Sequence, residues 1–265
     1  MNARVSELLL AGPAEAADLG GYLSRLLRFD KAAAVRVVAS GSAIGVYGQP
    51  PFDVLTLRAV ALGPGEAVTG ADITDAAKAS ANANAAATTA DTDIADIANT
   101  DTNADTSDIG AGTSDIDIDI TVSAGDLLHA IADDGSLALP RPLAGATAWT
   151  GFLPPRVGWQ AIGELPVAEV ETAALAGIAE FKERAEAIPD RERTRASVDG
   201  LAAEIWDRPL SFGLPVRAAH AARAMAFLGQ AQSASAVVRS AGRWLRLDAP
   251  FGTVVVRTGT GLLAG

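Results

Sequence analysis

Residues 33–62 read AAVRVVASGSAIGVYGQPPFDVLTLRAVAL and decide the fold class of this chain. A Gly-Ser pair and then a Pro-Pro pair divide the segment into three runs that are rich in apolar and β-branched residues. Such runs are typical of strands, and glycine and proline are typical of the turns between them. The segment therefore predicts three successive strands, 33–40, 43–49 and 52–62, of an antiparallel sheet, the first two joined by a hairpin turn.

Helical periodicity lies on both sides of this segment. Leucines at helical spacing predict a helix over residues 14–28, and an apolar stripe that starts after Pro166 predicts a longer helix that runs to Ile188. Residues 140–165 show neither period and predict a loop. The remaining predicted elements are a strand at 115–123, helices at 125–133, 198–207 and 214–228, and strands at 243–248 and 253–258.

The expected fold is α+β, with an antiparallel sheet in the N-terminal half and a helical C-terminal half that a β-hairpin closes. The expected domains are a sheet region of residues 1–65 and 115–165, a low-complexity insert of residues 66–114, and a helical region of residues 166–265. The alternative, that the sheet region and the helical region form one continuous domain, stays open at this point.

The charge of the chain is concentrated in one tract. Residues 66–119 contain 12 acidic residues and one basic residue, Lys78, and the whole chain has a net charge of −11. The rest of the chain is therefore balanced, and the acidic pI says nothing about what the folded part binds. The tract has few large apolar residues to offset the entropy of ordering, so a long disordered acidic loop is predicted.

Composition excludes several classes of protein. The chain has no cysteine, which removes disulfides, thiolate nucleophiles and cysteine-ligated metal sites. No window approaches the roughly 18 apolar residues that a membrane-spanning helix requires. Acidic residues surround the short apolar run near the N-terminus, so that run is not a secretory signal. A cytoplasmic protein is expected.

No set of residues predicts a catalytic or metal site. Asp115, Asp117, Asp119 and Asp126 match four positions of a calcium-loop template, but the glycine that the template requires is Ile120 in this chain. Alternation along a strand explains the same aspartates without a metal. The two histidines, His129 and His220, lie in no recognisable motif. We expect no catalytic residue, no metal ligand and no cofactor.

Aromatic residues gather in the loop before Pro166. Trp149, Phe152, Arg156 and Trp159 lie within 11 residues that also contain paired prolines. Tryptophan and arginine often anchor interfaces, and prolines reduce the entropy lost on binding. These four residues are the candidates for contact with a ligand or a partner, and the alternative is that the indoles are part of the core.

The C-terminal order of two helices and two strands predicts a winged-helix DNA-binding protein as the alternative. Residues 190–265 contain 10 arginines and six acidic residues, and Arg217, Arg223 and Arg243 are the candidates for DNA contact. The helix at 214–228 argues against this reading because it is apolar on two sides, whereas a recognition helix needs a free polar face.

Two local resemblances add to this reading. The phrases LLRFDKAAAVRVV, PPFDVLTLRAVAL and RWLRLDAPFG resemble an actinobacterial protein family of unknown function, and this resemblance implies no activity. Separately, residues 117–131, DIDITVSAGDLLHAI, resemble the strand-to-helix step of sterol-carrier-type domains, which enclose a lipid-lined tunnel.

Taken together, the residues favour a non-catalytic protein that binds a protein or a ligand. A winged-helix-like DNA-binding protein is the second hypothesis, and a hydrolase or isomerase of unrecognised type is the third. The partner is an unknown protein or small ligand, with neither nucleic acid nor membrane expected, and the oligomeric state stays open.

Overall fold

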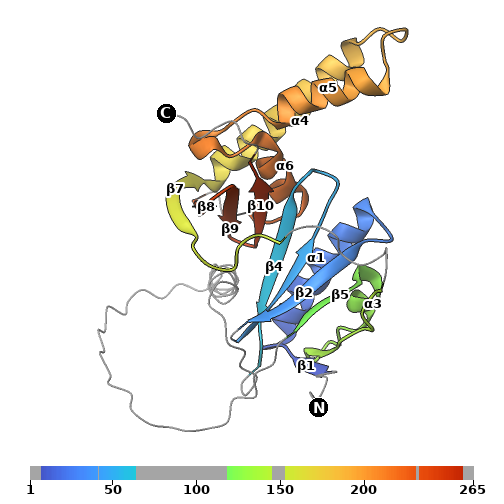
Figure 1. The fold of residues 1–265 in the computed structure, drawn as a ribbon, viewed down its shortest axis with the longest axis vertical. Helices are drawn as coiled ribbons and strands as arrows, with labels where there is room; N and C mark the ends of the chain where they lie inside the picture. The colour runs from blue at the N-terminus through green and yellow to red at the C-terminus, as the bar shows by residue number, and fades with distance from the viewer. Residues whose placement is uncertain (1–6, 41, 64–117, 145–152, 231–232, 259–265) are drawn as a thin grey trace.

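The computed structural model describes residues 7–40, 42–63, 118–144, 153–230 and 233–258. Its centre is an eight-stranded antiparallel sheet with the strand order β5-β2-β3-β4-β10-β9-β8-β7 (Figure 1). The first part of the chain supplies one half of this sheet and the last part supplies the other. The two halves meet where β4 pairs with β10, with Leu57 opposite Thr253.

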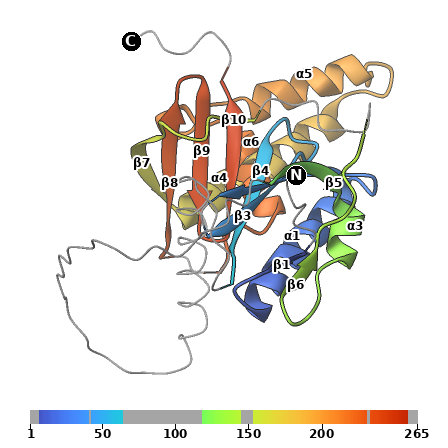
Figure 2. The ribbon, with the colours of Figure 1, turned by 60° about the horizontal axis from the view of Figure 1, so that its bottom comes forward.

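The first half of the sheet follows helix α1, whose leucines at helical spacing are buried against the strands. A side pairing of two short strands, β1 and β6, lies beside it (Figure 2). The elements are β1 (Glu7–Leu9), α1 (Pro13–Phe29), β2 (Ala34–Ser40), β3 (Ala43–Gly48), β4 (Leu55–Ala61), β5 (Asp119–Ser123), α3 (Ala124–His129) and β6 (Ser136–Ala138).

The second half begins with an edge strand and three helices and ends in a three-stranded meander. Helices α4 and α5 form a hairpin that projects from the body of the molecule (Figure 1). The elements are β7 (Gln160–Pro166), α4 (Val167–Ala187), α5 (Arg195–Trp206), a 3₁₀ turn η3 (Ser211–Gly213), α6 (Val216–Ala224), β8 (Ser235–Ala241), β9 (Trp244–Ala249) and β10 (Gly252–Arg257).

The two halves share one arrangement. Each has a helix that precedes three successive strands, β2-β3-β4 after α1 and β8-β9-β10 after α6. Each also has an outer strand that runs directly into a helix, β5 into α3 and β7 into α4. Helix α1 packs against α3, and α4 packs against α6. The order along the chain differs, since the outer strand comes last in the first half and first in the second.

One face of the sheet carries the helices and the main core. Residues that pair across an antiparallel ladder lie on the same face, so the register assigns Val37, Val46, Val254 and Leu247 to this face. All four are buried, together with leucines of α1 and small residues of α6. This continuous apolar layer joins the two halves into one core.

The second face carries more polar residues. A small apolar cluster of Val38, Ala43, Tyr47, Leu57 and Ala59 lies at its centre, and Leu153 packs against it. Towards the edge of the second half, the carboxylate of Asp248 accepts hydrogen bonds from Arg239, Arg246 and Thr253, at 2.9, 2.6 and 2.8 Å. Because Leu153 packs against the apolar cluster, the connection that precedes β7 lies across this second face.

The structure confirms the predicted α+β class, with its N-terminal antiparallel sheet, its helices in the second half and its closing hairpin, β9–β10. Several details differ, including the short strands β1 and β6, which the sequence did not predict. Residues 160–165, predicted as loop, belong to β7, which pairs with a strand, β8, that the sequence did not predict. The helix expected at 214–228 ends at Ala224, because Ala226 takes a φ of 59°.

The acidic tract lies almost wholly outside the described residues, so the predicted disorder stays a prediction. The division into domains likewise stays a prediction, beside the observed fact that strands of both regions form one sheet. Among the described helices, none combines the length and the apolar character needed to cross a membrane.

Candidate functional site

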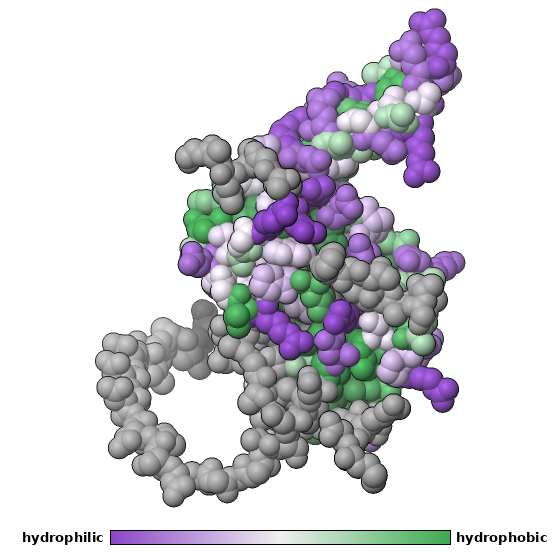
Figure 3. All heavy atoms as spheres, in the orientation of Figure 1, coloured by the Kyte–Doolittle hydropathy of each residue, from purple (hydrophilic) through white to green (hydrophobic). Residues whose placement is uncertain are grey.

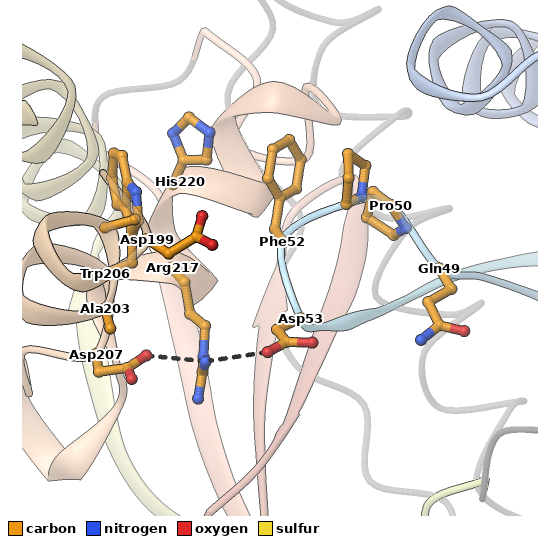
Figure 4. Close-up of a pocket in the computed structure, with 12 residues that line it drawn as sticks. Gln49, Pro50, Phe52, Asp53, Asp199, Ala203, Trp206, Asp207, Arg217 and His220 are labelled. Atoms are coloured by element: carbon orange, nitrogen blue, oxygen red, sulfur yellow. Dashed lines mark ion pairs between the residues drawn. The ribbon is translucent and has the colours of Figure 1, made fainter. Parts of the chain in front are cut away.

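A cleft of about 670 Å³ lies where the two halves of the molecule meet (Figure 4). Small-molecule sites are clefts of roughly 300–1,000 Å³ that combine apolar walls with a few placed polar groups. Three parts of the chain form its walls: the connection between β3 and β4, helix α5, and helix α6. The lining residues are Gln49, Pro50, Pro51, Phe52, Asp53, Asp199, Ala202, Ala203, Trp206, Asp207, Arg217 and His220.

The first wall is the connection between β3 and β4, residues 49–54. Pro50 and Pro51 stiffen it, and the backbone N–H of Phe52 donates to the carbonyl oxygen of Pro50 at 2.7 Å. Asp53 takes a φ of 57°, a left-handed conformation that aspartate tolerates better than most residues. The turn carries the ring of Phe52 to an edge-on contact with His220, with the ring centroids 4.7 Å apart.

Helix α5 forms the second wall, and α4 holds it in place. Thr194 and Ser197 form a reciprocal capping box at its start. Arg184 of α4 donates to both carboxylate oxygens of Glu204, at 2.8 and 2.7 Å. Trp206, the last residue of α5, contacts the ring of Phe181 on α4, with centroids 5.9 Å apart. The indole that faces the cleft is thus fixed by two anchored helices.

Glu180 of α4 ties the same hairpin to the loop after α5. Its carboxylate accepts two hydrogen bonds from Arg208, at 2.8 and 2.9 Å, and one from Arg184 at 3.1 Å. The hydrogen bonds from Arg208, and then those from Arg184, lower the pKa of Glu180 to about 2. Bidentate contacts of this kind add geometric specificity to an ion pair, so they fix the direction of the hairpin.

Arg217, in the first turn of α6, lies on the third wall between two carboxylates. Its Nη1 is 2.8 Å from Asp207 and 3.9 Å from Asp53, so it bridges the end of α5 and the β3–β4 connection (Figure 4). The Arg217 side chain is 23% exposed, and its Nε is buried without a hydrogen-bond partner. This guanidinium therefore links the two halves of the molecule on one wall of the cleft.

His220 lies one turn further along α6, between two aromatic rings. Besides Phe52, its ring contacts the indole of Trp206, with centroids 4.7 Å apart. Its Nδ1 is buried and has no hydrogen-bond partner. Burial, and then the charge of Arg223, lower the pKa of His220 below its usual value of 6.5. The imidazole is therefore neutral at pH 7 and adds an aromatic surface, not a charge, to the cleft.

The cleft comes from the parts of the molecule in which the two halves differ. Residues 49–54 join β3 to β4, whereas only Pro250 and Phe251 join the corresponding strands β9 and β10. Helix α4 is followed by a second helix, α5. The corresponding helix α3 has six residues and is followed by the short strand β6. The longer connection of the first half thus meets the additional helix of the second half.

The predicted aromatic loop lies elsewhere. Trp149 and Phe152 are outside the described residues. Arg156 is 63% exposed and lies 3.4 Å from Asp119. Trp159 is half-buried on the second face of the sheet, where its Nε1 donates to Pro155 at 2.9 Å and its ring lies under the guanidinium of Arg246. Arg156 and Trp159 therefore contact opposite halves of the sheet, and their role in binding stays a prediction.

The arginines of the DNA-binding alternative do not form one surface in α6. Arg217 belongs to the cleft, and Arg223 is paired with Glu171 at 3.7 Å. Arg243 lies in the turn between β8 and β9. Five of the nine residues of α6 are buried, which agrees with the two-sided apolar pattern that argued against a recognition helix.

The calcium template is also not assembled by the described residues. Asp115 and Asp117 lie outside them, and the Asp119 carboxylate accepts two hydrogen bonds from Arg36, at 2.6 and 2.9 Å. Asp126 lies in the first turn of α3, where its backbone N–H donates to Ser123. Within the described ranges, no group of three or more His, Asp or Glu side chains is placed to hold a metal ion.

Sequence reasoning missed most of the cleft. It considered Arg217 only as a DNA contact, placed His220 in no motif, and took Pro50 and Pro51 as a break between two strands. It also began the third strand at Phe52, so the connection at 49–54 gave no signal. One signal was present, since Arg217 and His220 are three residues apart, on one face of a helix.

Two family models match separate parts of the chain. Residues 3–104 match the model of a Domain of unknown function (DUF8010), and residues 154–261 match the model of a Domain of unknown function (DUF8185). No curated protein and no solved structure matches the chain. The resemblances to an actinobacterial family and to sterol-carrier-type domains stay predictions. Each match covers less than half of the chain, and residues from both matched segments line the cleft.

Proposed function

We propose that this protein is a ligand-binding protein and that the cleft between residues 49–53, α5 and α6 is its binding site. The observation that carries this proposal is the convergence of two asymmetric additions. The longer β3–β4 connection and helix α5 have no equivalent among the described residues of the other half, and together they enclose one cleft. If each of these two additions only served the packing of its own half, we would not expect both to line the same cleft.

Two features of the walls support binding. The indole of Trp206 and the rings of Phe52 and His220 supply flat apolar contact area, which aromatic residues provide at low cost in conformational entropy. His220, on the wall of the cleft, keeps a buried Nδ1 without a hydrogen bond. Buried polar groups without a partner are uncommon in native proteins, and a ligand or an ordered water at the cleft is a common reason for one.

The same geometry favours binding over turnover. His220 is the one histidine among the lining residues, and no hydrogen bond joins its ring to a carboxylate of the described chain. A general base in a catalytic pair is normally within hydrogen-bond reach of the group that orients it. The cleft has walls suited to recognition and lacks such a pair.

A block of the cleft tests the proposal. Ala203 is an exposed residue of α5 on the wall of the cleft, so Ala203→Trp fills the space with little effect on the core. Ala176 is an exposed residue of α4 outside the lining, and Ala176→Trp is the matched control. The measurement is the shift of backbone amide resonances in the labelled protein during titration with a fragment library of mixed charge.

We expect fragments that shift the amides of Phe52, Trp206 and His220 with dissociation constants of about 1 mM or tighter. These shifts should vanish in Ala203→Trp and persist in Ala176→Trp. If no fragment shifts these amides, or if the shifts survive the block, the cleft is not a binding site.

A further inference from the structure

The charges around the cleft point to the chemical class of its ligand, and this inference rests on the proposed function. Three carboxylates line the cleft, those of Asp53, Asp199 and Asp207, against one guanidinium, that of Arg217. His220 is neutral at pH 7, as described above. The lining therefore has an excess of two negative charges.

The excess is located at two of these carboxylates. Asp207 is the close partner of Arg217, at 2.8 Å, whereas Asp53 lies 3.9 Å from the same guanidinium. The Asp53 side chain is 91% exposed and that of Asp199 is 68% exposed, so both carboxylates are open to an incoming group. Asp199 forms an ion pair with Arg195, one turn earlier on α5, at 3.5 Å, and this pair is exposed to solvent on both sides.

An anionic ligand is disfavoured by this arrangement. It would have to displace Asp207 from Arg217 and then lie close to two further carboxylates. Like charges that share one site repel each other. Arg217 is thus a structural tie between α5 and the β3–β4 connection and does not act as an anion receptor.

A cationic ligand meets the opposite conditions. Carboxylates at the open side attract it, and aromatic faces attract a cation through their quadrupole, with tryptophan the strongest of the three rings. The indole of Trp206 and the ring of Phe52 form two such walls on either side of His220 (Figure 4). Aromatic walls combined with carboxylates are the chemistry that recognises an amine on an apolar body.

The α4–α5 hairpin leaves the open side of the cleft accessible. The hairpin projects beyond the sheet, and its surface is predominantly hydrophilic (Figure 3). Its charges are largely satisfied within the hairpin, since Glu180, Arg184, Glu204 and Arg208 pair with one another. Asp53 and Asp199 are therefore the carboxylates that a cation at the cleft would meet.

We propose that the cleft binds an organic cation, a protonated amine carried on an aromatic or aliphatic body of small-molecule size. Asp53 and Asp199 supply the charge, and Trp206 and Phe52 supply the apolar contact. The same chemistry is present in a free amine and in a basic side chain of a peptide. The volume of about 670 Å³ matches a small molecule.

A matched series of probes tests this proposal on the full chain. Benzylamine, benzyl alcohol and benzoate share one ring and differ in charge, and acetyl-Gly-Arg-Gly-amide represents a basic peptide. Each is titrated at low salt into the parent protein and into the variants Asp53→Asn and Asp199→Asn. Asparagine tolerates the left-handed backbone of residue 53 as aspartate does. Asp190→Asn, at the fully exposed tip of the hairpin, makes the same charge change outside the cleft.

Benzylamine should bind about tenfold more tightly than benzoate, with benzyl alcohol between them, because each exposed carboxylate contributes about two- to fivefold. Asp53→Asn and Asp199→Asn should each reduce this preference about two- to fivefold, while Asp190→Asn leaves it unchanged. Added salt should reduce it as well. Tighter binding of benzylamine than of the peptide identifies the free amine as the source, and the reverse order overturns the small-molecule assignment.

The failures of the two proposals are distinguishable. If benzoate or benzyl alcohol binds at least as tightly as benzylamine, and Ala203→Trp removes that binding, the cleft is a binding site but the cation assignment is wrong. If none of the four probes shifts the amides of the cleft but other fragments of the library do, only the cation assignment is overturned. If no fragment of the library shifts them either, both proposals are overturned together.

Discussion

The two halves of the sheet use one arrangement of strands and helices, yet the two corresponding junctions between a strand connection of one half and a helix of the other are built differently. At one junction, residues 49–54 form the β3–β4 connection, and Phe52 of this connection packs against His220 of α6. At the corresponding place near α1, Phe251 lies in a two-residue turn, and its carbonyl oxygen accepts a hydrogen bond from Arg58. One junction is filled by a direct contact, and the other is open.

This difference separates what holds the halves together from what the molecule presents to a ligand. The filled junction contains Tyr22 of α1, which stacks on Phe227 with centroids 6.0 Å apart, and the ion pair of Arg58 with Asp18 at 2.5 Å. The open junction contains Phe52, Trp206 and His220. Stability should therefore depend mainly on the first set, and binding mainly on the second.

The largest expected effect is at the filled junction. Phe227 is 2% exposed, and its ring occupies the space that a Cβ on Gly252 would need. Phe227→Ala should cost about 3–5 kcal/mol, because it removes a buried ring and leaves a cavity between the halves. Urea unfolding followed by fluorescence and by circular dichroism measures it.

The control is Phe212→Ala, since Phe212 is 43% exposed and should cost much less. Both probes should report a single transition, because one core spans the two halves. A change under about 1 kcal/mol for Phe227→Ala, or two separate transitions, would contradict the assignment of this junction as the link between the halves.

The second effect concerns the buried charge at the same junction. Arg58 is 3% exposed, and burial lowers its pKa although Asp18 acts in the opposite direction. Asp18→Ala leaves this guanidinium without its counterion and should cost about 2–3 kcal/mol, somewhat less than for a fully buried pair because Asp18 is itself 30% exposed. The double variant Asp18→Ala/Arg58→Met should recover most of the loss, and a double variant as unstable as the single one would show that charge is not the cause.

A smaller effect is expected on the second face, in the connection that precedes β7. Trp159 is half-buried over Arg246, so Trp159→Ala should cost about 1–2 kcal/mol through lost apolar contact and the cation–π interaction. Arg156→Ala should cost about 0.5 kcal/mol or less, because its pairing with Asp119 is largely exposed.

The same two variants test the aromatic loop as a binding surface. Recovery of partner proteins from a lysate is compared for Arg156→Ala and the parent chain, with chemical unfolding as the check on stability. Loss of a specific partner in Arg156→Ala, at unchanged stability, would establish this loop as a second site. Unchanged recovery would leave Trp159 with a packing role alone.

Local pattern was enough to predict most of the fold. Alternating and β-branched runs predicted β2, β3 and β4, and helical spacing predicted α1, α4 and α5, because side chains of each of these elements are buried in the core. Strands β7 and β8 were missed since their sequences, QAIGELP and SAVVRSA, lack strict alternation, and β7 is an exposed edge. Their pairing is set by tertiary contact with β9.

The cleft was not predictable from the sequence in the same way. Phe52 and His220 are 168 positions apart along the chain, and each alone resembles an ordinary core or surface residue. What brings them together is the register of β4 against β10, which no local pattern encodes. The spacing of Arg217 and His220 along α6 was the one local sign of a shared surface.

The smallest expected effect follows from the neutral histidine of the open junction. Burial and Arg223 hold the pKa of His220 below 6.5 in the folded protein, whereas the unfolded chain has the usual value. As the pH falls through 6.5, the unfolded state binds the proton first, so the free energy of unfolding decreases. The decrease ends once the pH is below the lowered folded pKa. Carboxylates in unfolded chains titrate near pH 4, so proton binding by carboxylates changes stability mainly at lower pH.

Chemical unfolding at a series of pH values between about 7.5 and about 5.5 measures this dependence, on either side of the ordinary histidine pKa. His220→Phe keeps an aromatic ring between Phe52 and Trp206 and removes the titration, so its stability should change less over the same range. A His129→Phe variant is measured beside it, because it removes the other histidine of the chain. An equal pH dependence in His220→Phe and the parent would mean that the imidazole is as well solvated in the folded protein as in the unfolded chain, and that the open junction does not desolvate the groups that line it.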